Sequence, residues 1–139
     1  MQVDIPEAGM ARLHTGLIPA WYHFFAAGAP ETVRFGFAHA RLVHGGHAVP
    51  LYYKEGLRMA WYGLKAGMHV NLDPEDQSNP FDSILSVTGG SLRARFAGTK
   101  RTLTKGESVF IPAGMTHEFW IEAGGEDAEV VLVMTGDGA

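Results

Sequence analysis

His117 is the side chain of this sequence that is best placed to do chemistry. It opens a run in which His117, Phe119 and Ile121 alternate with Glu118 and Trp120. Successive side chains of a β-strand point to opposite faces, so the histidine shares its face with the two apolar residues. A histidine that begins an inward face lies at the mouth of a barrel, where a small ligand reaches it. Because its ring exchanges a proton near neutral pH or binds a metal ion, His117 is a candidate catalytic and metal-ligating residue.

A second group of ionisable residues lies between positions 68 and 75. Apolar and polar residues alternate there, which predicts a strand whose two faces differ in chemistry. The polar face lines the cavity if the strand is turned one way and lies in solvent if it is turned the other way. The apolar set is Met68, Val70 and Leu72, and the polar set is His69, Asn71, Asp73 and Glu75.

The elements that must position these residues are short strands separated by turns. The 18 glycines fall between apolar runs rather than in one block, as is typical of an all-β domain with tight turns. Residues 57–64 and 129–134 are apolar on both faces, so we expect them in the centre of a sheet. Residues 32–43 also alternate and predict a strand. The glycine pair at 89 and 90 predicts a hairpin over residues 82–96.

The N-terminal residues 1–32 have a different character. They include a short segment with Trp21, Tyr22, Phe24 and Phe25, whose aromatic surface is costly to leave in water. We expect a short N-terminal arm or helical turn that covers the barrel or contacts a second copy. The remaining residues, 33–139, are expected to form one β-barrel domain.

The segment that ends at His117 carries a family resemblance. Gly106, Pro112, Gly114 and His117 match the second motif of the cupins, G-x5-P-x-G-x2-H-x3-N, up to its last position, where Ile121 replaces asparagine. The chain therefore resembles a small single-domain cupin of the conserved-barrel type. The resemblance implies an all-β fold, the cupin double-stranded β-helix, which is a jelly-roll-like antiparallel barrel. In cupins the histidine at this position is usually a metal ligand.

The first cupin motif, G-x5-H-x-H-x3,4-E-x6-G, is matched poorly. Counting from Gly67 places Asp73 and Glu75 where the motif has its two histidines, and counting from Gly63 places His69 at the first of them. The resemblance implies that co-ligands of a metal would come from this stretch. Such a carboxylate-rich set would prefer Mn, Fe(II) or even Mg to Cu.

The far end of the first motif leaves two registers open. Counting back seven residues from Gly90 reaches Ser83, and counting back from Gly89 reaches Asp82, so only one register supplies a carboxylate. The implied cofactor is one divalent metal, Fe, Mn, Ni or Zn, and the alternative is that no metal binds. The implied metal ligands are His117, His69, Asp73, Glu75 and Asp82.

Tyrosine offers a second kind of chemistry. Some metal-independent epimerase cupins pair a tyrosine general acid with a histidine, and the resemblance implies this role for Tyr52. Tyr52 and Tyr53 are adjacent in a predicted strand, so they point to opposite faces and one of them can enter the cavity. Without a metal, His117 would form hydrogen bonds in a partly apolar cavity lined by Phe110, Phe119 and an aromatic residue such as Trp61 or Tyr62.

The composition excludes several kinds of partner. The chain has 11 basic and 15 acidic residues, so we expect neither nucleic acid nor an anionic membrane surface as a partner. The absence of cysteine excludes disulfides and thiolate chemistry. Residues 16–28 are too short and too interrupted to form a signal peptide or a membrane span. We expect a cytoplasmic protein, and the resemblance implies a homodimer that binds a small-molecule ligand.

Two functions fit this sequence. The first is a metal-dependent enzyme of oxygenase, isomerase or lyase type that acts on a small carboxylate or carbonyl compound. The second is a metal-free cupin module that binds or senses a ligand without catalysis. The departures from the first motif favour the second function, and the intact second motif fits both.

Overall fold

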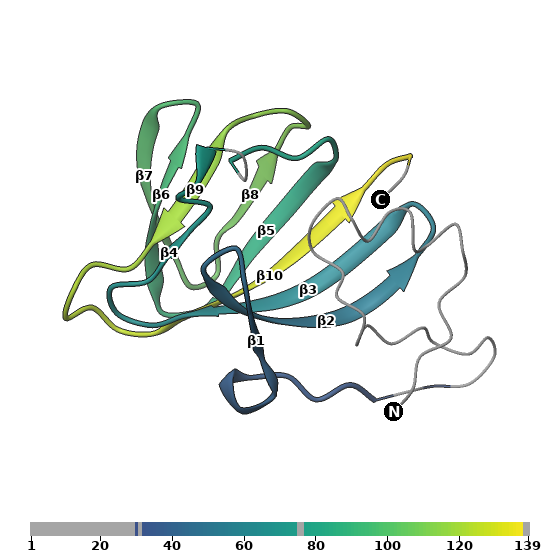
Figure 1. The fold of residues 1–139 in the computed structure, drawn as a ribbon, viewed down its shortest axis with the longest axis horizontal. Helices are drawn as coiled ribbons and strands as arrows, with labels where there is room; N and C mark the ends of the chain where they lie inside the picture. The colour runs from purple at the N-terminus through teal and green to yellow at the C-terminus, as the bar shows by residue number, and fades with distance from the viewer. Residues whose placement is uncertain (1–29, 31, 75–76, 138–139) are drawn as a thin grey trace.

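A computed structural model of the chain describes residues 30, 32–74 and 77–137. Two antiparallel sheets face each other, with strand orders β1-β2-β3-β10-β5-β8 and β4-β9-β6-β7 (Figure 1). This confirms the predicted all-β, jelly-roll-like barrel. The strands are β1 (Arg41–Val43), β2 (Gly46–Lys54), β3 (Leu57–Leu64), β4 (His69–Val70), β5 (Asp82–Gly89), β6 (Ser91–Phe96), β7 (Thr99–Thr104), β8 (Ser108–Ile111), β9 (His117–Trp120) and β10 (Ala128–Thr135).

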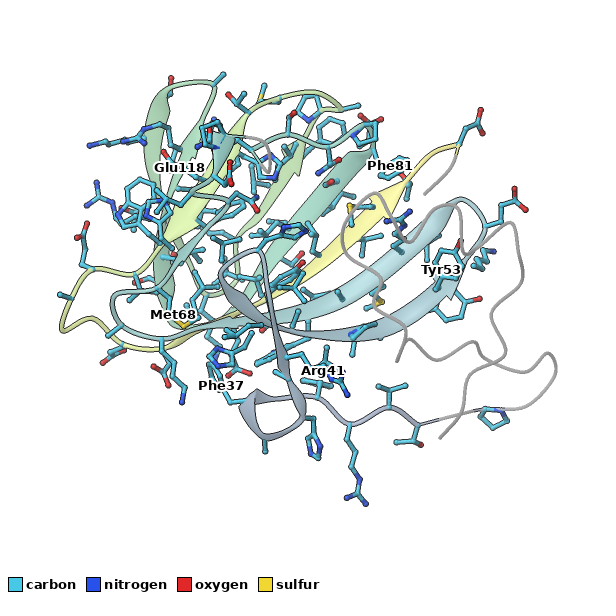
Figure 2. The ribbon with its side chains drawn as sticks, in the orientation of Figure 1. Phe37, Arg41, Tyr53, Met68, Phe81 and Glu118 are labelled. Carbon is cyan, nitrogen blue, oxygen red and sulfur yellow. The ribbon has the colours of Figure 1, made fainter. Side chains whose placement is uncertain are left out.

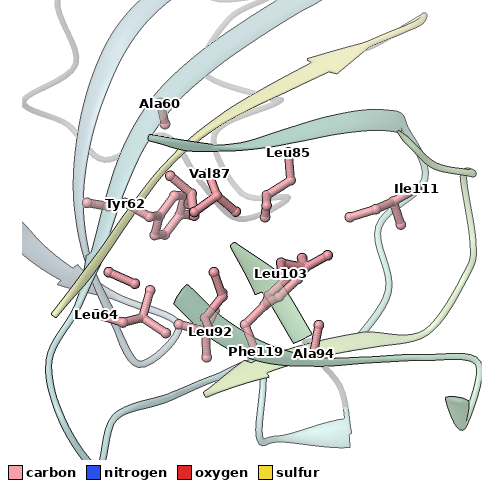
Figure 3. Close-up of a cluster of buried hydrophobic side chains, with 14 of the residues drawn as sticks. Ala60, Tyr62, Leu64, Leu85, Val87, Leu92, Ala94, Leu103, Ile111 and Phe119 are labelled. Carbon is pink, nitrogen blue, oxygen red and sulfur yellow. The ribbon is translucent and has the colours of Figure 1, made fainter. Parts of the chain in front are cut away.

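The core fills the space between the two sheets. Strands β3 and β10 lie at the centre of the larger sheet, as their apolar character predicted. Tyr62, Leu85 and Val87 of that sheet point toward Leu92 and Phe119 of the smaller sheet (Figure 3). Burying one large apolar side chain of this kind stabilises a fold by about 1.5–3 kcal/mol. Any site in this space is therefore backed by a well-packed apolar wall.

The predicted hairpin over residues 82–96 was wrong. β5 pairs with β10 and β8, whereas β6 pairs with β7 and β9, so the chain crosses between sheets at Gly90. Gly90 has a φ of 67° and passes close to the start of β10, where an added Cβ would lie 2.3 Å from the carbonyl oxygen of Asp127. Only glycine fits such an approach. The glycine pair marks a change of sheet and not a two-residue turn.

The alternation predicted for residues 68–75 holds for only two residues of strand. Val70 faces the core, but Asn71 takes a left-handed conformation with a φ of 61° and is also buried. Its N–H donates to the carbonyl of His44 at 3.0 Å. Because this residue interrupts the extended backbone, Leu72 is turned outward and is 62% exposed. The predicted separation of an apolar face from a polar face therefore does not hold beyond Val70.

The segment before β1 is less regular than predicted. Residues Phe37–His39 form one 3₁₀ turn, η1, and the strand begins only at Arg41. Phe37 packs edge-on against Trp61, with ring centroids 5.3 Å apart, so η1 covers the outer face of β3. Apart from residues 30 and 32, the predicted N-terminal arm lies outside the described residues. No helix in the described part of the chain is long and apolar enough to cross a membrane.

Candidate functional site

A small cavity lies between the sheets beside His117. Its volume is about 40 Å³. This is room for roughly three waters, and a cavity of about 150 Å³ is needed to hold benzene. Four polar side chains, those of Tyr62, Asn71, Ser83 and His117, face it among apolar neighbours. The apolar lining consists of Leu64, Val70, Leu85, Leu92, Ile111, Phe119, Val130 and Leu132.

His117 is held in one orientation by its own loop. Its backbone N–H donates to the carbonyl of Gln77 at 2.6 Å, and its ring Nδ1 lies 3.0 Å from the carbonyl of Met115. A carbonyl only accepts, so Nδ1 donates and the neutral ring carries its lone pair on Nε2. Burial lowers the pKa of His117, and the bond to Met115 opposes this in part. The ring is therefore a neutral acceptor at pH 7.

Tyr62 supplies the opposite hydrogen-bonding character. It comes from the centre of β3, and burial raises the pKa of its phenol, so it remains protonated throughout the neutral range. Ser83 Oγ donates weakly to the carbonyl of Phe81 at 3.4 Å. The amide of Asn71 completes the polar set. The cavity thus combines a neutral base with neutral donors and has no charged lining residue in the described part of the chain.

His69 does not join His117. The register pairs His69 with Trp120 and Val70 with Phe119, so the valine enters the core and the histidine lies on the outer face of the smaller sheet. There its Nε2 is 2.7 Å from Glu118 Oε2 (Figure 2 shows Glu118 over β9), and its ring stacks on Trp120 with centroids 5.2 Å apart. Burial and the nearby Arg95 lower the pKa of His69.

The structure places the two residues reached by the two registers of the first motif on opposite faces of β5. Ser83 pairs with the buried Ile111 and faces the cavity, whereas Asp82 is exposed on the other face of β5. Asp82 Oδ1 instead accepts the N–H of Ala113 at 2.9 Å, which fixes the turn after β8. The position counted back from Gly90 therefore reaches the cavity, and it carries a serine in place of a carboxylate.

The remaining predicted residues lie elsewhere. Asp73 is exposed in the loop after β4, beside a shallow surface hollow that also includes His44 and His69. Glu75 lies outside the described residues. Tyr52 does not line the cavity, because the register of β2 shifts before it and places it opposite Met59. The tyrosine that reaches the cavity is Tyr62.

The donor set around His117 does not fit a divalent metal. Such an ion needs three or four converging donors, and Fe, Mn, Ni and Zn favour imidazole and carboxylate. The cavity wall offers one imidazole, and its other polar groups are a neutral amide and two hydroxyls. Within the described ranges, no group of three His, Asp or Glu residues could hold a metal ion. We therefore derive no chemistry through a metal.

Sequence reasoning reached the other three polar cavity residues, Asn71, Ser83 and Tyr62, only in part. Ser83 was within reach, because one of the two registers pointed to it. Asn71 carried a weaker signal: asparagine adopts the left-handed conformation more readily than most residues, and so can interrupt a strand. Tyr62 was predicted only as one of the aromatic residues that could line the cavity. Nothing local in the sequence distinguished it from Tyr52 as a donor.

Comparison with solved structures identifies the type of fold. No protein-family model and no curated protein matches the chain, but solved structures do. A cupin 2 conserved barrel domain protein from Salinispora arenicola CNS-205 is similar with a TM-score of 0.67 and 18% identity, over 78% of this chain and 91% of that one. An RmlC-like cupin from Shewanella frigidimarina NCIMB 400 is similar with a TM-score of 0.60 and 16% identity, over 76% and 91%.

A third similar structure gives the same result. The cupin 2 conserved barrel domain protein from Leptotrichia buccalis aligns with a TM-score of 0.58 and 23% identity, over 75% of this chain and 44% of that one. The chain therefore has the fold of a small cupin-type domain, as its second motif implied. At these identities the likeness defines the fold alone, and function must be argued from the site.

Proposed function

We propose that this chain binds a small, uncharged organic molecule in the His117 cavity without a resident metal. The observation that carries this proposal is the bond from His117 Nδ1 to the carbonyl of Met115. It fixes the tautomer, so that Nε2 offers a lone pair to a ligand in a largely apolar space. The ligand must then carry an O–H or N–H donor.

The lining narrows the class of ligand further. An ionised ligand would lose its hydration in a cavity with no opposite charge among its described lining residues, which is costly. A carbonyl oxygen, by contrast, can accept from the protonated phenol of Tyr62. At about 40 Å³ the cavity admits only a small end group. The best match is a hydroxy-carbonyl compound or a primary amide that inserts a two- or three-carbon end.

Proton transfer is the second candidate function. His117 as a neutral base and Tyr62 as a neutral acid line the same cavity. The Nε2 lone pair would accept a proton from the carbon next to a carbonyl, while the phenol stabilises the enolate oxygen. Return of that proton to the same carbon restores the compound, or inverts it at a stereocentre. This is an isomerase-type activity that requires no metal.

One set of fragments tests both candidates. Hydroxyacetone, acetamide and acetate would be titrated into tag-free protein while the ring nitrogens of His117 are followed by NMR. We expect the two neutral fragments to bind and acetate not to bind. His117→Phe removes the acceptor and should weaken binding about five- to tenfold, the effect of one hydrogen bond of about 1–1.5 kcal/mol. The same protein would be incubated with hydroxyacetone in D₂O. If it catalyses exchange of the C–H hydrogens for deuterium, and His117→Phe and Tyr62→Phe both abolish this exchange, the result would favour the proton-transfer function.

Three results would contradict the binding proposal. They are the absence of binding by either neutral fragment, equal binding by His117→Phe, and near one equivalent of Fe, Mn, Ni or Zn in the purified protein. The last result, with the metal lost in both His117→Ala and Asp73→Ala, would restore the metalloenzyme hypothesis.

A further inference from the structure

A third hollow, larger than the His117 cavity, lies where the two sheets meet along their open edges. β7 ends the smaller sheet and β8 ends the larger one, so among the described strands each has one side without a strand partner. The groove between them has a volume of about 320 Å³, compared with about 40 Å³ for the His117 cavity. A volume of about 300 Å³ or more is typical of pockets for small organic ligands. We call this hollow the edge groove.

The walls of the edge groove are mainly apolar and include two aromatic rings. Phe96, at the end of β6, is buried, while Phe110 of β8 is 57% exposed. Val109, Pro112 and Met115 complete the apolar surface. Because Phe110 is so exposed in the free chain, its ring contributes little to the hydrophobic stabilisation of the fold. A flat apolar molecule packed against Phe110 would remove that surface from water.

One charged side chain faces the groove. Arg101 is opposite Ala94 in the β6–β7 pairing, and Ala94 belongs to the core, so the arginine extends from the core-facing side of β7. Its guanidinium lies 5.7 Å from the centroid of the Phe96 ring. Within the described residues Arg101 has no ion pair and is the only ionisable residue among those lining the groove. The planar guanidinium therefore remains available for a carboxylate.

We propose that the edge groove binds an aromatic monocarboxylate. The carboxylate would accept two N–H bonds from Arg101, and the ring would pack against Phe96 and Phe110. The positive charge of Arg101 favours an anionic ligand over a neutral or cationic one, and the apolar walls with their two aromatic rings favour an aromatic one. The edge groove shares no lining residue with the His117 cavity, whose lining carries no charged residue in the described part of the chain. Its ligand therefore differs in chemistry from the ligand proposed for the cavity.

One residue connects the two sites. Met115 lines the edge groove, and its carbonyl accepts the bond from His117 Nδ1. Removing the imidazole leaves the apolar walls and Arg101 in place. Binding in the groove should accordingly survive His117→Phe, which distinguishes a failure of this proposal from a failure of the function proposed for the cavity.

The test uses 2-naphthoate as the probe and the full chain at several protein concentrations. Calorimetric titration should give one site per chain. Arg101→Gln and the neutral analogue 2-naphthalenemethanol should each weaken binding about tenfold, as expected for loss of a charge-assisted bond. Phe110→Ala should weaken binding about threefold. Lys105→Gln removes an equivalent exposed charge from the turn after β7 and, like His117→Phe, should leave the affinity unchanged.

Circular dichroism and melting curves would check that each variant is folded. Binding that is not saturable, or that is equal in Arg101→Gln and the unaltered chain, would overturn the proposal, and the arginine would then serve only to protect the open edge from other strands. A second outcome would also overturn the proposal. If sedimentation shows that the chain is a dimer, that the dimer does not bind 2-naphthoate and that Phe110→Ala dissociates it, then a second copy of the chain occupies the groove.

Discussion

The two histidines of the smaller sheet show how one strand pair creates two different environments. His117 faces the core, where its Nδ1 donates to the carbonyl of Met115 and its ring lines the cavity. His69 faces outward and is already bonded to Glu118, which in turn pairs with Arg95. Burial lowers the pKa of both rings. What separates a candidate site from a structural contact here is therefore the face of the sheet and the set of partners, and not the residue type.

The largest expected effect on stability comes from comparing the inner and outer faces of β9 at two neighbouring aromatic residues. Phe119 packs in the core against Phe96, with ring centroids 5.7 Å apart, whereas Trp120 lies on the outer face. Phe119→Ala should reduce the free energy of unfolding by about 3–5 kcal/mol because it leaves a cavity. Trp120→Ala should cost about 1 kcal/mol, because its neighbours remain solvated. Urea unfolding measures both values, and an equal loss would show that the outer face is part of the core.

A smaller effect is expected from the carboxylate of Glu118. It is 6% exposed and accepts from both His69 and Arg95. Glu118→Gln keeps the size but removes the charge, and should destabilise the fold by about 1–2 kcal/mol, since the Arg95 side chain is 37% exposed and partly screened. Fragment binding in the His117 cavity should not change. Weakened binding with unchanged stability would instead connect the outer network to the cavity.

The smallest effect concerns pH. The pKa of His117 is lowered in the folded chain, so the unfolded chain takes up the proton first, at its ordinary pKa of about 6.5. The stability contribution of the neutral ring is therefore complete above that value and falls as the pH decreases toward the folded pKa. Unfolding at pH 7.5, 6.5 and 5.5 should show this loss, and His117→Phe should reduce it.

His69 serves as the matched control for the pH test. Its side chain is 29% exposed and its pKa is also lowered, so the same sign applies with more screening by solvent. His69→Phe should reduce the pH dependence less than His117→Phe. A larger reduction in His69→Phe would contradict the view that the inner histidine is the more strongly buried base.

The segment before His117 was predictable because its turn residues fix both ends of a short strand. Gly106 and Gly114 have positive φ values, as their places in the motif require, and the alternation of β9 then determines which residues face inward. The stretch before β5 lacked such markers. The prediction that alternate residues share a face requires an extended backbone. Asn71 is in the left-handed conformation, so the prediction failed from that residue on.

The tyrosine assignment and the crossing at Gly90 depended on long-range pairing. The register of β2 shifts between Pro50 and Tyr52, and no local pattern in the sequence announces that shift. Likewise, two glycines between alternating runs are typical of a hairpin, and only the approach of β10 to Gly90 separates the two strands into different sheets. Contacts of this kind are set by the whole chain.

The central position of β10 has a consequence for how the chain folds. β10 is the last strand in the sequence but lies between β3 and β5, and Trp61 Nε1 bonds to Glu129 across 68 residues. Contacts so distant along the chain make folding slow, because a large loop must close before they form. During synthesis, β3 and β5 would each present an open edge until β10 emerges. Aggregation should therefore compete with folding mainly before this final strand is in place.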